Sequence, residues 1–146
     1  MDTRQLLRLV RRDAPIVRGV FARDTLPETI QWPSGYIINT DPVSEPGEHW
    51  VAVFIDHNGV GEYFDSFGLP PLHDALTLFL NKHCVSWTFN SRHLQDVMSM
   101  ACGLYCVYYL RMRCRGVARE RLLRIFSDDY SNNDAIVRHL VKINDT

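Results

Sequence analysis

The sequence has almost no net charge and lacks any long hydrophobic run. Its 146 residues include 16 lysines and arginines against 17 aspartates and glutamates, a formal charge of −1. This balance argues against a strongly basic coat protein and against an acidic disordered chain. No apolar stretch approaches the roughly 20 residues needed to span a bilayer. The length suits one domain with a hydrophobic core, so we predict a single domain over residues 1–146.

A secretory signal is also missing from the start of the sequence. Residues 1–13, MDTRQLLRLVRRD, carry charges throughout their apolar positions, whereas a signal has an uninterrupted apolar core. We interpret this segment as an amphipathic helix with Leu6, Leu7 and Val10 on one side. We therefore expect a protein that is not secreted, has no membrane partner and keeps its thiols reduced.

The four cysteines do not form a zinc-ribbon pattern. They stand at positions 84, 102, 106 and 114, and no two are spaced as a C-x2-C pair. A mixed cysteine and histidine metal site that uses His83 or His93 is the weaker alternative. We therefore expect free thiols and no metal.

Turn residues and apolar runs predict a mixture of strands and helices. Residues 41–48, DPVSEPGE, are typical of a loop, and Asn133 is a capping candidate for the last helix. Strands are predicted at 34–42, 50–56, 61–64 and 85–90, and helices at 1–13, 69–84, 103–114, 117–126 and 134–143. The second of these helices has four leucine and phenylalanine side chains on one face, Leu72, Leu76, Phe79 and Leu80. The order favours an α+β domain with a central mixed or antiparallel sheet flanked by helices.

The segment 93–106, HLQDVMSMACGLYC, changes from polar to apolar around Cys102. With Ser99 as the N-cap, Cys102 would lie in the first helical turn, where unpaired backbone N–H groups and the helix dipole lower the pKa of a thiol. Gly103 would let a substrate carbonyl approach the backbone, and Cys106 would be buried one turn further on. The alternative is that Cys102 is a small core residue, because free cysteines are commonly buried.

A thiolate nucleophile also needs a base and a group that orients the base. Among the six histidines, His49 has the most informative context, because a loop ends and an apolar strand begins there. Its ring could face a cleft while the strand holds its backbone. A structural histidine at the start of a strand is the alternative.

The hairpin that follows His49 supplies a partner for it. If residues 57–59 form a three-residue loop with the glycine left-handed, Val51 lies opposite Asp65. His49 and Asp65 are then diagonal neighbours on one face, within reach of a hydrogen bond. A two-residue loop would place the two side chains on opposite faces, and a solvated strand end is the alternative for Asp65.

Three motifs stand in order along the chain. They are GEHW, which ends at Trp50, FDSFG at 64–68, and Q-x6-C-G-x-Y-C, which begins at Gln95. In this order they resemble adenain, the adenovirus-type cysteine endopeptidase, and its relatives in the ubiquitin-like-protein protease superfamily. The resemblance covers about residues 34–110, and the seven-residue step from Gln95 to Cys102 is similar to the adenovirus branch. Two departures are an aspartate where adenovirus enzymes usually have glutamate, and a shorter chain after the cysteine.

The resemblance implies roles for particular residues. It implies that His49 is the general base, that Asp65 orients it, and that Cys102 is the nucleophile at the N-terminus of the central helix. It implies that the Gln95 side chain donates in the oxyanion hole. It also implies that Trp50 helps to form a narrow slot for glycine on the acyl side of the substrate, although an ordinary core aromatic is an equal alternative.

The resemblance further implies a function. We expect a cysteine protease with papain-like chemistry that cleaves structural precursor proteins of a virus or virus-like element at Gly-Gly or Gly-x sites during virion maturation. It would act as a monomer in the virion and in the host nucleus or cytoplasm, with no cofactor required for the chemistry. The first alternative is a deconjugating protease for ubiquitin or a ubiquitin-like modifier. The second alternative is an inactive interaction domain of the same fold.

Two features concern regulation. Adenovirus enzymes are activated by a short viral peptide and by DNA, so the resemblance implies both as partners. Cys84 lies eleven residues before Gln95, similar to the position of the peptide-linked cysteine in that family; an unpaired strand-edge or core thiol is the alternative. Arginines form one cluster between 111 and 124 and a second at positions 8, 11 and 12. These clusters could bind phosphate backbones or form solvated helix faces.

Overall fold

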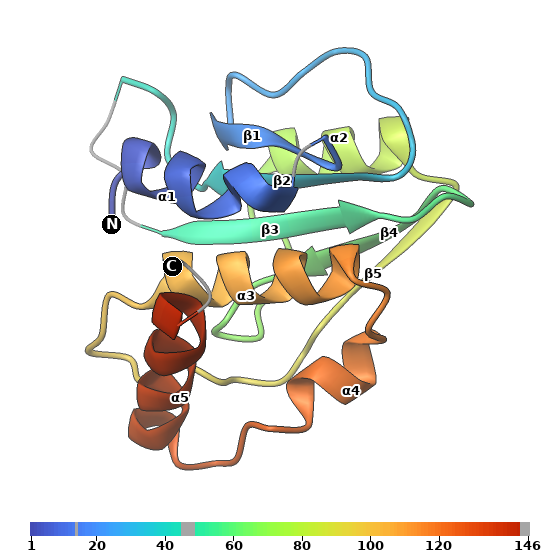
Figure 1. The fold of residues 1–146 in the computed structure, drawn as a ribbon. Helices are drawn as coiled ribbons and strands as arrows, with labels where there is room; N and C mark the ends of the chain where they lie inside the picture. The colour runs from blue at the N-terminus through green and yellow to red at the C-terminus, as the bar shows by residue number, and fades with distance from the viewer. Residues whose placement is uncertain (14, 45–48, 144–146) are drawn as a thin grey trace.

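The structure is a computed structural model that describes residues 1–13, 15–44 and 49–143 (Figure 1). Gly47 and Glu48 of the GEHW motif, and residues 45–48 of the predicted loop, therefore lie outside the described residues. The strands are β1 (Val17–Ala22), β2 (Ser34–Asn39), β3 (Trp50–Ile55), β4 (Val60–Phe64) and β5 (Ser86–Phe89). The helices are α1 (Thr3–Val10), α2 (Asp74–His83), α3 (Cys102–Cys114), α4 (Arg119–Leu123) and α5 (Tyr130–Ile143), with a short 3-10 turn, η1 (Arg11–Asp13).

The five strands form one mixed sheet in the order β1-β2-β3-β4-β5. β2, β3 and β4 are antiparallel neighbours, whereas β1 pairs with β2 and β4 pairs with β5 in parallel. The predicted α+β class, with a central mixed sheet flanked by helices, is confirmed. The sequence patterns missed β1, whose six residues are mostly half-buried at the edge of the sheet.

The central strands are buried on both faces, because helices cover both sides of the sheet. On one face Ala52 and Phe54 pack with α1, α3 and α5. On the other face Val51 and Val53 pack with α2. Figure 1 shows α3 running along β3, with α4 and α5 further from the sheet. This explains why 50–55 reads as a continuous apolar run rather than an alternating one.

The hairpin between β3 and β4 has the predicted three-residue loop. Gly59 is left-handed, with a φ of 81°, and the Asp56 N–H donates to the Val60 carbonyl at 3.0 Å. Ala52 lies opposite Phe64 in the ladder. Because the strands are antiparallel, the next residues at the end of the ladder are Val51 and Asp65, so the predicted register is confirmed.

A side-chain cap sets the start of α1, and α2 starts after two prolines. Asp2 caps α1 in a capping box, in which its carboxylate accepts the Gln5 N–H at 2.8 Å. The helix buries Leu9, whereas Leu7 is 44 % exposed, so its predicted place on the buried side is wrong. α2 begins only at Asp74, after two prolines, and Leu72 is exposed outside it.

Two predicted helix caps are also wrong. α3 begins at Cys102 with Ala101 as its N-cap and no side-chain cap, so Ser99 lies too early in the chain to cap it. α5 begins at Tyr130, four residues before the predicted start, with Asp129 accepting a first-turn N–H. Asn133 is instead a buried side chain that donates to the Leu94 carbonyl at 3.0 Å. Throughout the described part of the chain, no helix is long and apolar enough to cross a membrane.

Candidate active site

The end of the β3–β4 hairpin brings His49 and Asp65 together. His49 Nε2 lies 2.9 Å from Asp65 Oδ1. The same carboxylate oxygen accepts the Phe67 N–H at 2.8 Å, and Asp65 is 4 % exposed. A buried carboxylate held in this way fixes both the position and the tautomer of the imidazole. With Nε2 paired to Asp65, Nδ1 is the ring nitrogen left for a second partner.

That second partner is Cys102, the first residue of α3. Burial alone would raise the pKa of the Cys102 thiol. Hydrogen bonds with His49 and with the backbones of Trp50 and Gly103, together with the positive charge on His49, lower that pKa below its ordinary value. Cys102 is the first residue of α3, where the positive end of the helix dipole also favours an anion. The side chain is therefore set up as a thiolate.

The pKa of His49 moves in the opposite direction. Burial of the ring disfavours its charged form, but hydrogen bonds and charge interactions with Asp65 and Cys102 raise the pKa to about 9. A raised imidazole pKa and a lowered thiol pKa both favour the same state. The two shifts therefore favour an imidazolium–thiolate ion pair over the neutral pair.

Gln95 lies beside this pair with its side-chain amide held from both ends. Ser66 Oγ donates to Gln95 Oε1 at 2.5 Å, and Gln95 Nε2 donates to the carbonyl and to the hydroxyl of Ser99, each at 3.1 Å. Gln95 and Ser66 are both 1 % exposed. The amide is therefore fixed in orientation, and its N–H groups point along the segment that leads to Cys102. An oxyanion bound there would replace one of the two contacts with Ser99.

Aromatic rings cover the base from the side away from the sheet. Phe67 stacks on the His49 ring with centroids 5.1 Å apart and planes 24° from parallel. His93 contacts the other side of Phe67 and stacks in turn on Tyr130 of α5. His93 Nε2 also lies 2.5 Å from the Gln95 carbonyl oxygen. This ring cluster limits the access of water to the His49–Asp65 hydrogen bond.

These residues line one cleft of about 290 Å³, whose wall includes His49, Gln95 and Cys102. The cleft rim carries the exposed apolar side chains Val97 and Met100. Three of the four predicted catalytic side chains therefore line one hollow, and the fourth, Asp65, is hydrogen-bonded to His49. Their roles in a reaction stay predictions.

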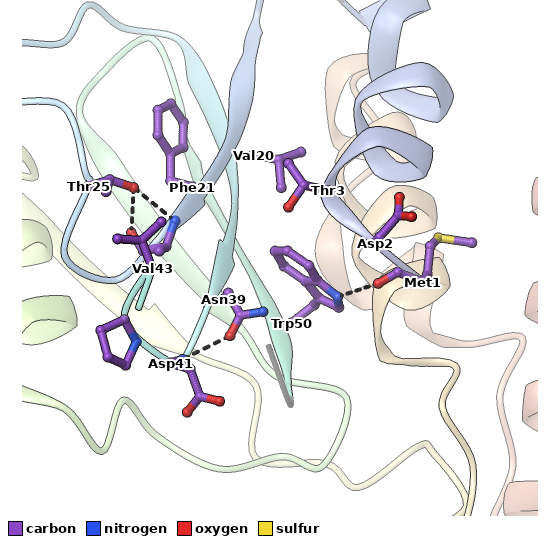
Figure 2. Close-up of a pocket in the computed structure, with 12 residues that line it drawn as sticks. Met1, Asp2, Thr3, Val20, Phe21, Thr25, Asn39, Asp41, Val43 and Trp50 are labelled. Carbon is purple, nitrogen blue, oxygen red and sulfur yellow. Dashed lines mark hydrogen bonds between the residues drawn. The ribbon is translucent and has the colours of Figure 1, made fainter. Parts of the chain in front are cut away.

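Trp50 lines the cleft, and Gly103 lies between Trp50 and Leu6 of α1. Trp50 is 7 % exposed, and its Nε1 donates to the Met1 carbonyl at 3.1 Å, as Figure 2 shows. A Cβ on Gly103 would lie 3.1 Å from Leu6 and 3.5 Å from the Trp50 ring. The absence of a side chain at 103 thus lets α1 and the indole pack against α3. Substrate binding by Trp50 and Gly103 stays a prediction.

Cys84 does not join this cleft. It is half-buried beside Gly61 and packs with the hydrophobic cluster on the α2 face of the sheet, whereas Cys102 belongs to the cluster on the opposite face. Burial and the nearby Asp56 raise the pKa of Cys84 to about 11, which disfavours thiol exchange. Cys106 is fully buried, and burial raises its pKa as well. Attachment of a peptide to Cys84 stays a prediction.

The arginine cluster at 111–124 is not one continuous basic face. Arg111 is buried and donates to the Leu9 carbonyl, and Arg113 makes two bonds of 2.9 Å to the Glu62 carboxylate. Within the two predicted clusters, the exposed arginines are at 115, 121 and 124 and at 8, 11 and 12. DNA binding stays a prediction. Within the described residues no group of three metal-binding side chains is present, so His83 and His93 gain no support as ligands.

Sequence reasoning missed the residues that support the predicted ones. Ser66 and Phe67 lie inside the FDSFG motif but were assigned no role. Asn90 follows β5, and its Oδ1 accepts the Asp65 N–H at 3.2 Å. Because β4 and β5 are parallel, both residues lie at the same edge of the sheet. A polar residue directly after each strand was the available signal, but it is useful only once the parallel pairing is known.

Viral proteases are similar to this chain over its middle part. The "Cysteine protease S273R" of African swine fever virus is 32% identical over 95 residues, which is 58% of this chain and 35% of that protein. The same protein from another isolate of this virus, named "SUMO-1 cysteine protease S273R", is 30% identical over 108 residues, 65% of this chain and 40% of its own length. The chain thus spans well under half the length of these relatives. No family model matches the sequence.

Two solved structures share the fold. The crystal structure of the African swine fever virus protease superposes with a TM-score of 0.50 at 27% identity, over 62% of this chain and 37% of that one. The central domain of the Lpg1148 protein of Legionella pneumophila gives a TM-score of 0.56 at 17% identity, over 99% of this chain and 96% of that one. The likeness to the viral protease is one of sequence and fold, whereas the likeness to the Legionella domain is one of fold alone. The narrower resemblance to adenain stays a prediction.

Proposed function

We propose that this chain is a cysteine protease domain that cleaves peptide bonds after glycine in precursor proteins of a virus or virus-like element. The observation that carries the proposal is the position of His49 between Asp65 and Cys102. That position gives opposite pKa shifts to base and nucleophile. The names of the viral relatives support protein substrates and a viral setting.

The first half of the reaction follows from the ion pair. The Cys102 thiolate attacks the carbonyl carbon of the substrate, so a C–S bond forms and the carbonyl oxygen becomes an oxyanion. The Cys102 backbone N–H and the Gln95 amide donate to this oxyanion. His49 gives its Nδ1 proton to the amide nitrogen as the C–N bond breaks, and the amine leaves. A thioester on Cys102 remains.

The second half releases the acid. His49, now neutral, takes a proton from a water molecule as the water oxygen attacks the thioester carbonyl. The C–S bond breaks, the carboxylic acid leaves, and the imidazolium–thiolate pair is restored. Asp65 stabilises the imidazolium in both halves without accepting the proton.

Trp50 supports the preference for glycine. Its buried ring lines the cleft together with Cys102, and a bulky ring at that place favours a substrate residue without a side chain. A Gly-Gly-type peptide reporter tests the function directly. Wild-type protein should cleave it, Cys102→Ala should not, and Cys114→Ala, which removes a half-buried thiol outside the cleft, should retain activity. Full activity in Cys102→Ala would rule out the proposal.

Removal of ubiquitin or a ubiquitin-like modifier is the second candidate function, and the SUMO-1 protease name of one relative favours it. The chemistry at Cys102 is the same, and only the leaving partner differs. Full-length modifiers that carry a reactive group at the C-terminal glycine should then label Cys102, while short Gly-Gly peptides should be poor substrates. Rapid cleavage of short peptides with no labelling by modifiers would favour the endopeptidase.

A further inference from the structure

Three apolar side chains are exposed beside the cleft, at Val97, Met98 and Met100. The two methionines, 88 % and 81 % exposed, are the most exposed large apolar side chains in the part of the chain that the structure describes. Val97 and Met100 line the same cleft of about 290 Å³ as Cys102. We call these three side chains the apolar rim. Exposed apolar side chains that are grouped at one place mark a surface that binds a partner.

Hydrogen bonds hold the backbone that carries the apolar rim. The Asp96 carboxylate accepts the Met98 N–H, and the Asp96 carbonyl accepts the Ser99 N–H, each at 3.0 Å. The Asp96 N–H donates in turn to the carboxylate of Asp134 in α5 at 3.4 Å. These bonds close a turn, and its apolar side chains remain on the outside. An apolar side chain of a partner would remove their surface from water, which is favourable.

The position of the apolar rim indicates which part of a substrate would reach it. Trp50, where the proposed function places the acyl side of the substrate, donates a hydrogen bond to Met1 just before α1. Figure 1 shows the start of α1 on one side of the first turn of α3 and the segment that leads into α3 on the other. Ser99, between the two methionines, accepts both bonds from the Gln95 amide, so the rim also adjoins the predicted oxyanion donor. A peptide that passes from Trp50 across Cys102 therefore leaves the cleft over the apolar rim.

We propose that the apolar rim binds an apolar side chain of the substrate protein on the amine side of the scissile bond, within the first three residues after that bond. This inference rests on the proposed function. A leucine, methionine or phenylalanine side chain covers Val97 and Met100, and the unbranched methionine adapts to each of these shapes. No charged residue occurs between 97 and 101, so a charged substrate side chain finds no ion-pair partner in this segment. The rim adds a selectivity for apolar residues after the cleavage site to the selectivity for glycine before it.

Binding of uncleaved peptides tests the apolar rim separately from catalysis. Fluorescent peptides contain Gly-Gly followed by leucine, serine or glutamate at the first, second or third position, with serine at the other two. Their dissociation constants for Cys102→Ala protein are measured by fluorescence anisotropy. At one position, leucine should bind about tenfold more tightly than serine, and glutamate should bind no better than serine. The leucine advantage should persist as salt is added, because salt screens charges and not apolar burial.

Variants then assign the effect to the apolar rim. Val97→Ser with Met100→Ser removes the apolar surface that lines the cleft, so the leucine advantage should fall to less than about twofold. Leu72→Ser with Val85→Ser is the matched control, because it removes two exposed apolar side chains outside the cleft. The control should leave the leucine advantage unchanged. Since all four side chains are exposed, both proteins should keep their fold, which circular dichroism checks.

The outcomes separate this inference from the proposed function. No leucine advantage at any position, no binding of any peptide, or an advantage that survives in the Val97→Ser and Met100→Ser protein would each overturn the inference. Wild-type protein that sediments as a dimer, and as a monomer after the same two changes, would also overturn it, because a second copy then covers the apolar rim. If leucine peptides bind as expected but wild-type protein cleaves no Gly-Gly peptide, the proposed function fails and the rim stands as a peptide-binding surface. If no leucine advantage is found and wild-type protein cleaves the serine peptides, the reverse holds.

Discussion

Ser66 Oγ donates a hydrogen bond of 2.5 Å to Gln95 Oε1, across 29 positions of sequence. The Ser66 carbonyl also accepts the backbone N–H groups of Leu94 and Gln95, at 2.8 and 3.2 Å. The residue directly before it, Asp65, holds His49, and the residue directly after it, Phe67, stacks on the His49 ring. One tripeptide after β4 therefore positions both the predicted base, His49, and the predicted oxyanion donor, Gln95.

We expect Ser66→Ala to lower kcat by roughly tenfold with little change in KM. The Gln95 amide loses the bond that fixes its orientation, and removal of an oxyanion donor outright typically costs about 10²–10³-fold. Steady-state kinetics on a Gly-Gly reporter measures the effect. In a Gln95→Ala background the same change should cost less than about twofold, because no donor remains to be oriented. Equal losses in both backgrounds would mean that Ser66 acts only on the fold.

Asp65→Asn should lower kcat/KM by about 10²–10⁴-fold while the protein stays folded. The amide can donate to His49 Nε2, which selects the wrong tautomer, and it no longer stabilises the imidazolium. Because Oδ1 contacts both His49 Nε2 and the Phe67 N–H, an amide nitrogen at that position would also lose the bond from Phe67. Reporter kinetics measures the loss, and circular dichroism checks the fold. Asp128→Asn, an exposed aspartate outside the cleft, is the matched control, and wild-type rates in Asp65→Asn would remove Asp65 from the site.

The pH dependence of activity should be bell-shaped. Proton transfer to the leaving amine needs the imidazolium, so activity falls as pH rises through the His49 pKa of about 9. Attack needs the thiolate, so activity also falls as pH drops through the pKa of Cys102, which lies below its ordinary value. Rates on the reporter from acidic to alkaline pH give both limbs, which belong to the coupled pair rather than to either residue alone. Activity that rises steadily through the His49 pKa would contradict an imidazolium donor.

Iodoacetamide labelling gives an independent view of the same pair. In wild-type protein, Cys102 should react at a lower pH than an ordinary cysteine, because its pKa is lowered by the hydrogen bond and charge of His49. In His49→Ala the labelling should require a higher pH, because the hydrogen bond and the charge that lower the pKa are gone and burial now raises it. Mass spectrometry of labelled peptides separates Cys102 from the other three cysteines. Absence of labelling at Cys102 near neutral pH would favour an inactive interaction domain.

Local signals in the sequence determined how much of this site was predictable. Asn58-Gly59 specified the hairpin, and the hairpin register placed His49 next to Asp65. The position of Cys102 at the start of α3 followed from the change in polarity around it. Its predicted cap, Ser99, was wrong because α3 begins only at Cys102, with Ala101 as the N-cap.

Contacts between distant segments were not predictable in the same way. β1 pairs with β2, and β4 with β5, through parallel ladders that have no local turn signal. Without the second pairing, nothing linked Asn90 to Asp65. The Ser66–Gln95 hydrogen bond likewise depends on a loop that returns to the end of β4. Ser66 is one of many polar residues in the sequence, and no pattern around it indicates a partner 29 residues away.

Gly68 provides a last test, because it fixes the tripeptide that organises the site. Its φ is +74°, and a Cβ there would lie 2.8 Å from the Ser91 carbonyl oxygen and from the Arg92 carbonyl carbon. Gly68→Ala should therefore lower the free energy of unfolding by about 1–3 kcal/mol from backbone strain. The close approach of the new Cβ to Ser91 and Arg92 should add to this loss of stability. The variant should also have lower activity per folded molecule, because Phe67 and Asp65 are displaced. Gly116→Ala is the matched control, because Gly116 has a φ of +82° and a Cβ added there would meet no atom within 4 Å. Chemical denaturation and reporter kinetics measure both variants. Gly116→Ala should lose stability from backbone strain alone and keep wild-type activity. If Gly68→Ala also keeps wild-type activity, the loop that contains Gly68 does not position the predicted catalytic residues.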